Sequence, residues 1–298
     1  MTSVFGANPI TEKNILIIGA GYLGRPVAEQ LRTWGNKVVL WVRSLESKQT
    51  LQAQGFEAYA ADVTEKSNWK KIGKDFHDVI YMPSTRGGTV DDYRKLYVQG
   101  LHLATEHFPY DTRILFLSST SVYPQQNSEW VDETSPTDNT SSKPASLLAA
   151  EQLVLRRDGS VIRLSGIYGP GRCAMLQRLL DGRPLSVHDA QRWLNQIHRD
   201  DAISAILHVL TLPRGVLVNA TDSMPVKRLE LYAWLAKLTG LPQLPLTQQP
   251  ESRQRGNTNK RVSNKKLLSL GWIPNYPTYE LGYRQLLDSF SFNQTRPA

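Results

Sequence analysis

The chain has 298 residues, of which 40% are hydrophobic and 21% charged, and its formal net charge is +8. This composition is that of a globular protein, and the length predicts one large α/β unit with a smaller lobe. The single cysteine, Cys173, excludes an internal disulfide and favours a reducing compartment, so we expect a cytoplasmic protein. No apolar stretch reaches the roughly 18 residues that span a bilayer, and residues 1–13 lack the pattern of a signal peptide.

The charge is unevenly distributed along the chain. The first 140 residues hold 14 Lys and Arg against 16 Asp and Glu, whereas the remainder holds 21 against 11. The basic half indicates either a solvated surface or a lobe that attracts an anionic small-molecule substrate, such as a phosphorylated or carboxylated compound. Nucleic acid is not expected as a partner, because the basic residues are scattered and no binding motif is recognisable.

Apolar, β-branched runs recur at the spacing of alternating strands and helices. They lie at 14–18, 37–42, 56–61, 78–82, 113–117 and 160–164. Helical patterns between them place apolar residues on one face, as in 23–34 and 93–104. This alternation predicts an α/β fold, a doubly wound parallel sheet with helices on both faces.

The later part of the chain has a looser pattern. Residues 124–144 are polar and rich in proline, which predicts a long loop of the kind that often serves an active site. A helix is expected from about Ala145 to Arg156. Further helices are expected at 200–211, begun by Asp200 and Asp201, at 227–239, and at 263–270, begun by Ser263.

Three glycines follow the first apolar run. Gly19 permits a tight turn, Gly21 lets the backbone approach a pyrophosphate, and Gly24 lets the next helix pack on the strand. The helix start at Tyr22 and Leu23 offers unpaired N–H groups and a partial positive charge. The pattern predicts a Rossmann-type dinucleotide site; the alternative is a glycine turn kept for packing alone.

The end of the second strand bears on the choice of cofactor. It reads Trp41-Val42-Arg43-Ser44, with no acidic residue until Glu46 to hold the ribose hydroxyls of NAD. Arg43 can pair with a 2′-phosphate, so the sequence favours NADP(H) over NAD(H). The alternative for Arg43 is a solvated residue at a strand end.

Asp62 and Val63 follow the third strand. In this topology an adenine ring edge lies near that position. An equally weighted alternative is that Asp62 or Thr64 caps the next segment.

Eight segments in order resemble the extended short-chain dehydrogenase/reductase superfamily, and within it the NAD-dependent epimerase/dehydratase family. They are GAGYLG at 19–24, LSSTSVYP at 117–124, VDETSP at 131–136, AAEQLV at 149–154, RLSGIYGPG at 163–171, HRDDAISAI at 198–206, VNATD at 218–222 and VSNKKLLSLGWIP at 262–274. The resemblance implies an NAD(P)-binding Rossmann domain over residues 1–165, to which a segment at about 196–222 returns. Residues 166–298 would then form mainly a substrate-binding lobe.

The resemblance also implies a catalytic Ser, Tyr and Lys, and here the chain departs from the family. Ser119 stands at the family's Ser position. The Tyr-x-x-x-Lys pair should precede Glu151, but Leu147 stands in place of Lys and Lys143 in place of Tyr. No tyrosine occurs from Pro124 to Ile167, so the dyad is absent. This departure resembles the atypical branch of the superfamily.

Other residues are candidates for the missing chemistry. Lys143 could act as the acid/base if it is partly buried, since burial lowers the pKa of a lysine; otherwise it is a solvated loop residue. Tyr123 could supply a phenol, although its position in the family is non-catalytic. Ser119 and Thr120 could orient a carbonyl or hydroxyl group, or merely satisfy the backbone at a strand end.

Further candidates follow from the resemblance. Ser165, Gly166 and Ile167 match the segment that runs past the nicotinamide in the family. His198 and Tyr168 lie in framework segments, and we expect structural roles for both. Cys173 lacks a paired histidine motif, so a packing thiol is expected rather than a nucleophile.

A basic segment near the C-terminus matches the place where nucleotide-sugar members bind the diphosphate. It reads Arg255-Gly256-Asn257, with Arg253, Lys260 and Arg261 nearby. Together with Arg172, Arg255 is a candidate contact for an anionic substrate. The alternative is an exposed basic loop.

These observations leave three hypotheses. The first is an NAD(P)(H)-dependent oxidoreductase or epimerase/dehydratase-like enzyme acting on a small sugar-like or anionic substrate. The second is a non-catalytic NADP(H)-binding redox sensor or regulatory protein, and the third a folded member without a cofactor. We expect no metal and no membrane partner. The resemblance implies a homodimer, since family members often dimerise through the helices after the fourth and fifth strands, and the matching helices here, at 91–108 and 145–156, are apolar enough to allow it.

Overall fold

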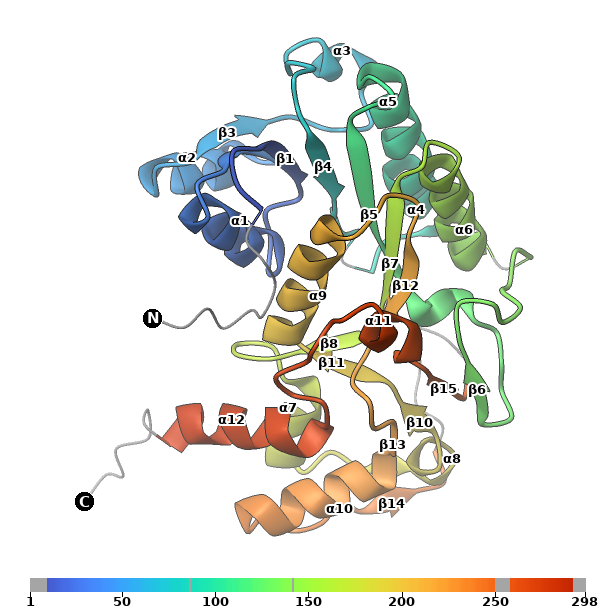
Figure 1. Cartoon of the computed structure of the whole chain (residues 1–298). Helices are drawn as coiled ribbons and strands as arrows, with labels where there is room; N and C mark the ends of the chain where they lie inside the picture. Colours follow the sequence, from blue (N-terminus) through green and yellow to red (C-terminus); the bar gives the residue numbers. More distant parts are fainter. Residues whose placement is uncertain (1–9, 86, 141, 250–257, 292–298) are drawn as a thin grey trace. The chain divides into compact units, whose positions relative to one another are not determined.

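The computed structural model describes residues 10–85, 87–140, 142–249 and 258–291 (Figure 1). The chain divides into two compact units. Unit 1 contains the chain up to Val122, Thr137–Arg163 and Ile203–Val218, and unit 2 contains Tyr123–Pro136, Leu164–Ala202 and the chain from Asn219. Each unit is therefore assembled from separate segments of the sequence.

Unit 1 is built around a seven-stranded sheet with the order β12-β7-β5-β4-β1-β2-β3. The pairs β1–β2, β2–β3, β1–β4 and β4–β5 are parallel. This arrangement confirms the predicted doubly wound α/β fold. The strands are β1 (Asn14–Ile18), β2 (Lys37–Val42), β3 (Glu57–Ala60), β4 (Asp78–Tyr81), β5 (Arg113–Ser119), β7 (Ser160–Leu164) and β12 (Leu217–Ala220).

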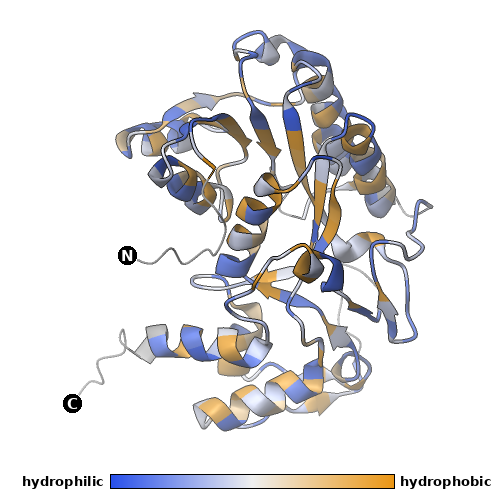
Figure 2. Cartoon of the chain, viewed as in Figure 1, coloured by the Kyte–Doolittle hydropathy of each residue, from blue (hydrophilic) through white to orange (hydrophobic). Residues whose placement is uncertain are grey.

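The strands form the core because they are hydrophobic over most of their length (Figure 2). Residues Ile15–Ile18 of β1 are fully buried, as expected of a central parallel strand covered on both faces. Helices lie on both sides of the sheet, α1 and α9 on one side and α5 and α6 on the other (Figure 1). The helices are α1 (Gly24–Thr33), α2 (Leu45–Ala53), α3 (Lys66–Trp69), α4 (Val90–Tyr93), α5 (Gly100–His107), α6 (Ser142–Leu155) and α9 (Arg199–Thr211).

The helix predicted around 93–104 is interrupted by a π-helical segment, η1 (Arg94–Gln99), between α4 and α5. The Gly100 N–H donates to the Lys95 carbonyl, five residues back. The hydroxyl of Tyr81 donates to the Leu96 carbonyl at 2.5 Å. A Cβ on Gly100 would overlap that hydroxyl, so the glycine leaves room for a tyrosine against the helix backbone.

A buried ion pair attaches α6 to the sheet. Arg163 on β7 donates to both carboxylate oxygens of Glu151, with Nη2 to Oε2 at 2.6 Å and Nε to Oε1 at 3.0 Å. Ser118 on β5 donates to the same carboxylate at 2.5 Å. All three residues are buried, so the carboxylate is held by charge and by hydrogen bonds from two strands.

Unit 2 contains short elements around a separate apolar core. Its centre includes Leu185, Leu231, Leu235, Tyr283 and Leu286. The strands are β6 (Glu129–Val131), β8 (Gly166–Tyr168), β9 (Leu185–Ser186), β10 (Trp193–Leu194), β11 (Gln196–His198), β13 (Val226–Lys227), β14 (Leu246–Thr247) and β15 (Lys260–Val262). The helices are α7 (Ala174–Leu180), α8 (Val187–Ala190), α10 (Arg228–Thr239), α11 (Lys265–Ser269) and α12 (Tyr279–Ser291), and a 3₁₀ turn, η2 (Thr120–Val122), precedes the first segment of the unit.

Two local expectations differ from the structure. The segment expected as a loop at 124–144 contains β6, which pairs in parallel with β15. Asp201 lies in the first turn of α9 as expected, but its carboxylate accepts hydrogen bonds from the amides of Asn275 and Tyr276, at 2.7 and 2.9 Å. Its side chain therefore binds a distant loop.

No helix in the described ranges has the length and apolar character needed to cross a bilayer.

We predict that Glu151→Ala lowers the free energy of unfolding by about 3–5 kcal/mol, because it leaves the Arg163 guanidinium buried without its carboxylate. Urea unfolding followed by circular dichroism measures this change. Glu29→Ala is the control: it removes an exposed ion pair with Arg25 on α1 and should cost about 1 kcal/mol or less. Equal losses in the two variants would contradict this account of the buried pair.

Candidate functional site

The strand order reverses at β1. From β1 the chain runs outward to β2 and β3 on one side, and then returns to β4 and β5 on the other. In open α/β sheets, ligands bind outside the carboxyl ends of the strands at such a reversal. The loops after β1, β4 and β5 meet at this edge, which makes it the candidate site.

The glycine turn after β1 depends on close backbone contacts. Gly19 has φ +102°, a conformation that favours glycine, and its N–H donates to the Trp41 carbonyl at 2.9 Å. A Cβ on Gly19 would lie 2.7 Å from the Pro83 nitrogen, in the loop after β4. A Cβ on Gly24 would overlap the Gly19 carbonyl oxygen. Both glycines are therefore required by the packing of the turn.

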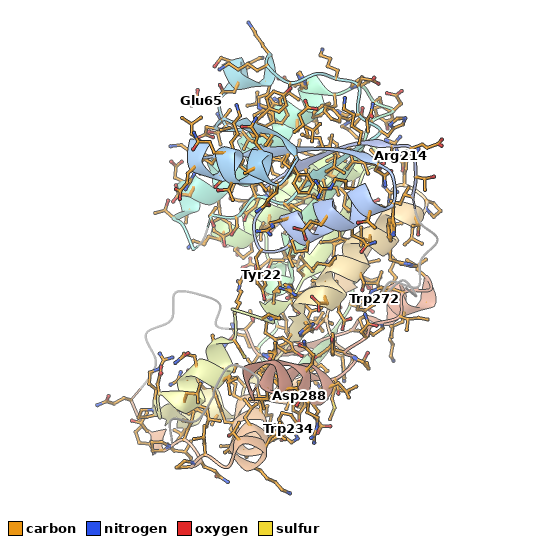
Figure 3. All side chains as sticks on the ribbon, turned by 90° about the vertical axis from the view of Figure 1, so that its left-hand side faces the viewer. Tyr22, Glu65, Arg214, Trp234, Trp272 and Asp288 are labelled. Carbon is orange, nitrogen blue, oxygen red and sulfur yellow. The ribbon has the colours of Figure 1, made fainter. Side chains whose placement is uncertain are left out.

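Gly21 differs from these two glycines. It is exposed, and no protein atom lies within 4 Å of the position that its Cβ would occupy. Tyr22, which is partly buried, follows it at the start of α1 (Figure 3). Within the described part of the chain, the amides of Leu23 and Gly24 have no hydrogen-bond acceptor. An open cradle with free amides at a helix N-terminus fits the pyrophosphate of a dinucleotide.

The residues after β2 and β3 lie at the adjoining part of the same edge. Arg43 is exposed, and its guanidinium forms no hydrogen bond or ion pair with the residues that the structure describes. Ser44 caps α2 by accepting from the Ser47 amide at 3.2 Å. Asp62 accepts from the amide and hydroxyl of Thr64, both at 2.8 Å, while Val63 is buried. Arg43 is thus available to a ligand, whereas Ser44 and Asp62 also have local structural roles.

Ser119 and Thr120 stand at the carboxyl end of β5. Ser119 is partly exposed, and its Oγ accepts from the Ser121 amide at 3.1 Å. Thr120 is buried in the 3₁₀ turn that follows. The Ser119 hydroxyl keeps its own proton available for a ligand oxygen.

Lys143 lies in the first turn of α6 and is partly buried. Its Nζ lies 5.3 Å from the centre of the Tyr93 ring, at the end of α4. Sequence reasoning did not identify Tyr93 as a functional residue; it recognised this residue only as part of an apolar helical face.

Several sequence candidates in unit 2 have structural partners. Tyr123 is fully buried, and its hydroxyl donates to Asn219 at 2.8 Å. His198 is also fully buried, where burial lowers its pKa, and its ring lies 4.1 Å from that of Tyr276. Burial raises the pKa of the Cys173 thiol, which makes it a poor nucleophile. These residues pack as framework.

The other unit 2 candidates lie around β8 and in the loop that follows it. Ser165 Oγ donates to the Ala220 carbonyl at 3.3 Å, next to the exposed Gly166 and the partly exposed Ile167. Tyr168 is buried, and burial raises the pKa of its phenol. Arg172 is exposed, whereas Arg255 lies outside the described residues.

Lys260 is a buried cation on β15. Its Nζ donates to the Tyr123 carbonyl and to the Thr258 hydroxyl, both at 2.8 Å. Burial, with a smaller contribution from the Arg192 charge, lowers its pKa to about 8. Lys260 therefore fixes the backbone at the beginning of the 123–136 segment.

Among the described residues, no cluster of three or more His, Cys, Asp or Glu side chains has the arrangement of a metal site.

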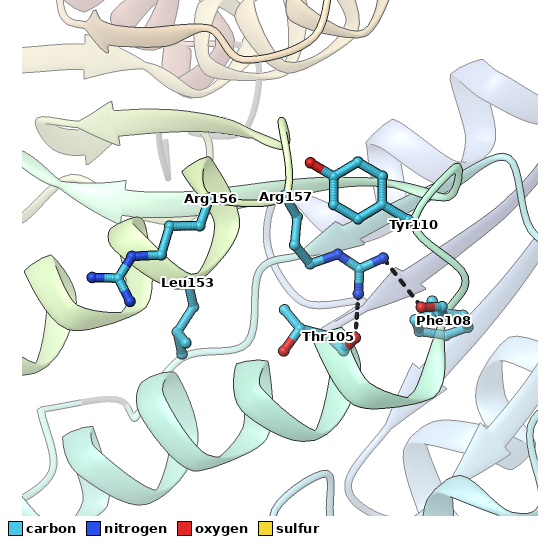
Figure 4. A pocket seen from close by; sticks show the side chains of 6 residues that line it. All are labelled: Thr105, Phe108, Tyr110, Leu153, Arg156 and Arg157. Atoms are coloured by element: carbon cyan, nitrogen blue, oxygen red, sulfur yellow. Dashed lines mark hydrogen bonds between the residues drawn. The ribbon is translucent and has the colours of Figure 1, made fainter.

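A pocket on unit 1 lies away from the candidate site. It is lined by Thr105, Phe108, Tyr110, Leu153, Arg156 and Arg157 (Figure 4). Arg157 donates to the carbonyls of Thr105, Phe108 and Pro109. These residues precede β5 and β7, so the pocket lies at the amino ends of the strands. The Arg157 guanidinium donates hydrogen bonds to carbonyl groups in the last turn of α5 and just after it. This pocket is structural.

A family model and a curated protein both match most of this chain. Residues 15–220 match the NAD dependent epimerase/dehydratase family. Protein YeeZ of Escherichia coli strain K12 is 28% identical over 240 residues, which cover 77% of this chain and 85% of YeeZ.

Solved structures extend this likeness. A protein of Methylobacillus flagellatus that carries the description NAD-dependent epimerase/dehydratase is 30% identical, with a TM-score of 0.75 over 94% of this chain and 99% of its own. The dTDP-glucose 4,6-dehydratase of Bacillus anthracis, solved with NAD, has a TM-score of 0.78 at 18% identity, over 94% of this chain and 97% of its own. At 18% identity, this similarity shows a shared fold and nothing about activity.

We predict that Lys260 makes stability rise with pH. Its pKa is about 8 in the folded chain, against an ordinary 10.5, so between these values the unfolded chain binds more protons. Stability should therefore increase as the pH rises through this range, by at most about 3 kcal/mol. Urea unfolding at a series of pH values measures the slope.

Comparing the pH dependence of the free energy of unfolding in wild type and in Lys260→Met isolates the contribution of Lys260, since the variant should not become more stable as the pH rises. Lys265→Met, at an exposed lysine on α11, should keep the wild-type increase. An unchanged slope in Lys260→Met would disprove the prediction.

Proposed function

The chain belongs to the NAD-dependent epimerase/dehydratase family, as its motifs predicted, and from this premise we propose that it is an NAD(P)(H)-dependent oxidoreductase or epimerase/dehydratase-like enzyme. Its substrate would be a small sugar-like or anionic molecule. The observation that carries the proposal is the glycine turn at the strand-order reversal, where Gly21 leaves an open cradle. When bound there, the nicotinamide supplies a hydride donor or acceptor.

The proposed cofactor contacts come from loops at the carboxyl ends of strands, from the start of α1 and from strand β8. The glycine turn would hold the pyrophosphate, the residues after β2 and β3 the adenosine half, and the residues at β8 the nicotinamide half. They are Gly19, Gly21, Tyr22, Leu23, Gly24, Arg43, Ser44, Asp62, Val63, Ser165, Gly166 and Ile167.

The preference for NADP(H) over NAD(H) is part of the proposal. It is supported by the exposed Arg43 guanidinium and by the absence of an acidic residue before Glu46 at the end of β2. A guanidinium matches the oxygens of a 2′-phosphate, whereas an acidic residue there would repel them.

For catalysis we propose Ser119, Thr120 and Lys143. Ser119 would donate a hydrogen bond to a substrate oxygen, and the Lys143 ammonium would stabilise negative charge that develops on it. Arg172 and Arg255 are proposed contacts for the anionic part of the substrate. The proposal also includes a cytoplasmic location and a homodimer.

A non-catalytic, NADP(H)-binding sensor is the second candidate. The observation that favours it is the absence of any tyrosine from Pro124 to Ile167. Incubation with UDP-glucose and dTDP-glucose, followed by chromatography of the products, separates the two candidates. An epimerised, dehydrated or oxidised product supports the enzyme, whereas cofactor binding without any product supports the sensor.

We predict tighter binding of NADPH than of NADH. One charge-assisted contact between Arg43 and the 2′-phosphate is worth about 1.5–3 kcal/mol, or roughly 10- to 150-fold in Kd. Titration followed by nicotinamide fluorescence measures both affinities. Arg43→Ala should weaken NADPH to the level of NADH and leave NADH unchanged. Equal affinities in the wild type would overturn the preference.

We also predict that Gly21→Leu abolishes binding of both cofactors, because the new side chain occupies the cradle. Stability should change by less than about 0.5 kcal/mol, since nothing in the protein opposes the added atoms. The two measurements are fluorescence titration and urea unfolding. Normal cofactor binding in a folded Gly21→Leu would place the cofactor elsewhere.

A further inference from the structure

The contact between Lys143 and Tyr93 is the end of a column of aromatic rings in unit 1. Tyr97 on η1 packs on Phe116 of β5, with ring centres 5.9 Å apart. Tyr93 packs edge-on against Tyr97 at 5.2 Å, and the Lys143 ammonium lies over Tyr93. Tyr97 is buried, whereas Tyr93 is partly exposed, so the column runs outward from the sheet and ends in a phenol and an ammonium.

The local structure of the helix fixes the place of Tyr93. Thr89 begins α4 with a capping box, in which its amide donates to Asp92 at 2.7 Å and its hydroxyl accepts from the Asp92 amide. The π-helical segment follows immediately, and within it the Leu96 carbonyl accepts a hydrogen bond from the Tyr81 hydroxyl. A π-helical turn adds one residue and so rotates the residues before it relative to α5. Such insertions occur frequently at functional sites.

The charges around the pair leave the Lys143 ammonium available. Asp91 pairs with Arg94 and Lys95, at 2.9 and 2.8 Å. The Asp92 carboxylate is held by the Thr89 cap. Within the described ranges Lys143 forms no ion pair, and its ammonium lies over the Tyr93 ring, 5.3 Å from the ring centre.

Two fully buried tyrosines, Tyr81 and Tyr123, are unsuited to proton transfer. Tyr81 is fully buried and donates to a backbone carbonyl. Tyr123 is fully buried and donates to Asn219. Tyr93, by contrast, is partly exposed and lies beside a cation, in the helix that follows the carboxyl end of β4.

We propose that Tyr93 and Lys143 replace the missing Tyr-x-x-x-Lys dyad, with Tyr93 as the catalytic acid/base and Lys143 as its electrostatic partner; this inference rests on the proposed function. In the oxidising direction the O–H bond of a substrate hydroxyl breaks, and its proton bonds to the Tyr93 oxygen, which enters as phenolate. The electron pair of that O–H bond forms the second carbon–oxygen bond, and the hydrogen on the same carbon would leave with its own electron pair to the oxidised nicotinamide of the proposed cofactor. In the reducing direction the same proton returns from the phenol to the substrate oxygen.

Kinetic tests use Tyr93→Phe, Lys143→Met and Lys143→Arg, with UDP-glucose and dTDP-glucose as probes. Tyr93→Phe keeps the ring under Lys143 and removes only the hydroxyl, so kcat should fall about 10²- to 10⁴-fold while KM and NADPH affinity stay unchanged. Lys143→Arg should retain more activity than Lys143→Met. The matched control is Tyr110→Phe, at the opposite edge of the sheet, which removes the hydroxyl from a ring whose centre lies 5.7 Å from the Arg157 guanidinium carbon. Wild-type activity in Tyr93→Phe would overturn the proposal.

A second measurement needs no turnover. Tyr93 is nitrated with tetranitromethane and Lys143 is reductively methylated, each followed by mass spectrometry of its peptide. Saturating NADPH should slow both modifications, whereas ADP-ribose, which lacks the nicotinamide, should slow neither. Tyr110 is the internal control and should be nitrated at the same rate throughout.

The outcomes of the labelling separate the two proposals. Binding of NADPH without protection of Tyr93 and Lys143 overturns this inference alone and leaves the proposed function standing. Failure to bind NADPH or NADH overturns the proposed function and this inference with it. If the wild type converts neither sugar nucleotide, the protection experiment decides the inference.

Discussion

The structure depends on a close backbone contact where no side chain fits. Gly19 lies against the Met82–Pro83 peptide, and Gly24 lies against the carbonyl of Gly19. This contact brings the start of α1 to the edge of the sheet beside the loop after β4, at the reversal of strand order. Gly21, the third glycine of the turn, faces open space. Two glycines thus build the turn, and the third leaves it accessible to a ligand.

A second set of contacts fixes the helices that carry the polar side chains. The Glu151 carboxylate is held by Arg163 and Ser118, which secures α6 to β5 and β7. Lys143 stands in the first turn of that helix. The Tyr81 hydroxyl holds η1 through the Leu96 carbonyl, one turn beyond Tyr93. Buried polar contacts on two helices therefore hold in place the partly exposed Tyr93 ring and the Lys143 ammonium over it.

The sequence allowed much of the fold to be predicted, because strand burial and glycine spacing are local patterns. Runs of apolar residues marked six strands of the sheet, and the spacing of Gly19, Gly21 and Gly24 marked the turn. The pairing of Tyr93 with Lys143 could not be predicted, since it joins residues from separate helices across a π-helical insertion. Asp201 shows the same limit: its position suggested a local cap, but its partners, Asn275 and Tyr276, lie far along the chain.

The order in which the segments occur along the chain has a consequence for biosynthesis. The sheet of unit 1 ends in β12, which the ribosome makes well after the other six strands, and unit 2 also draws its residues from three stretches. A nascent chain that has passed β7 still exposes the edge on which β12 will pair. Until residue 220 has emerged, that edge has no native partner and is open to pairing with other strands.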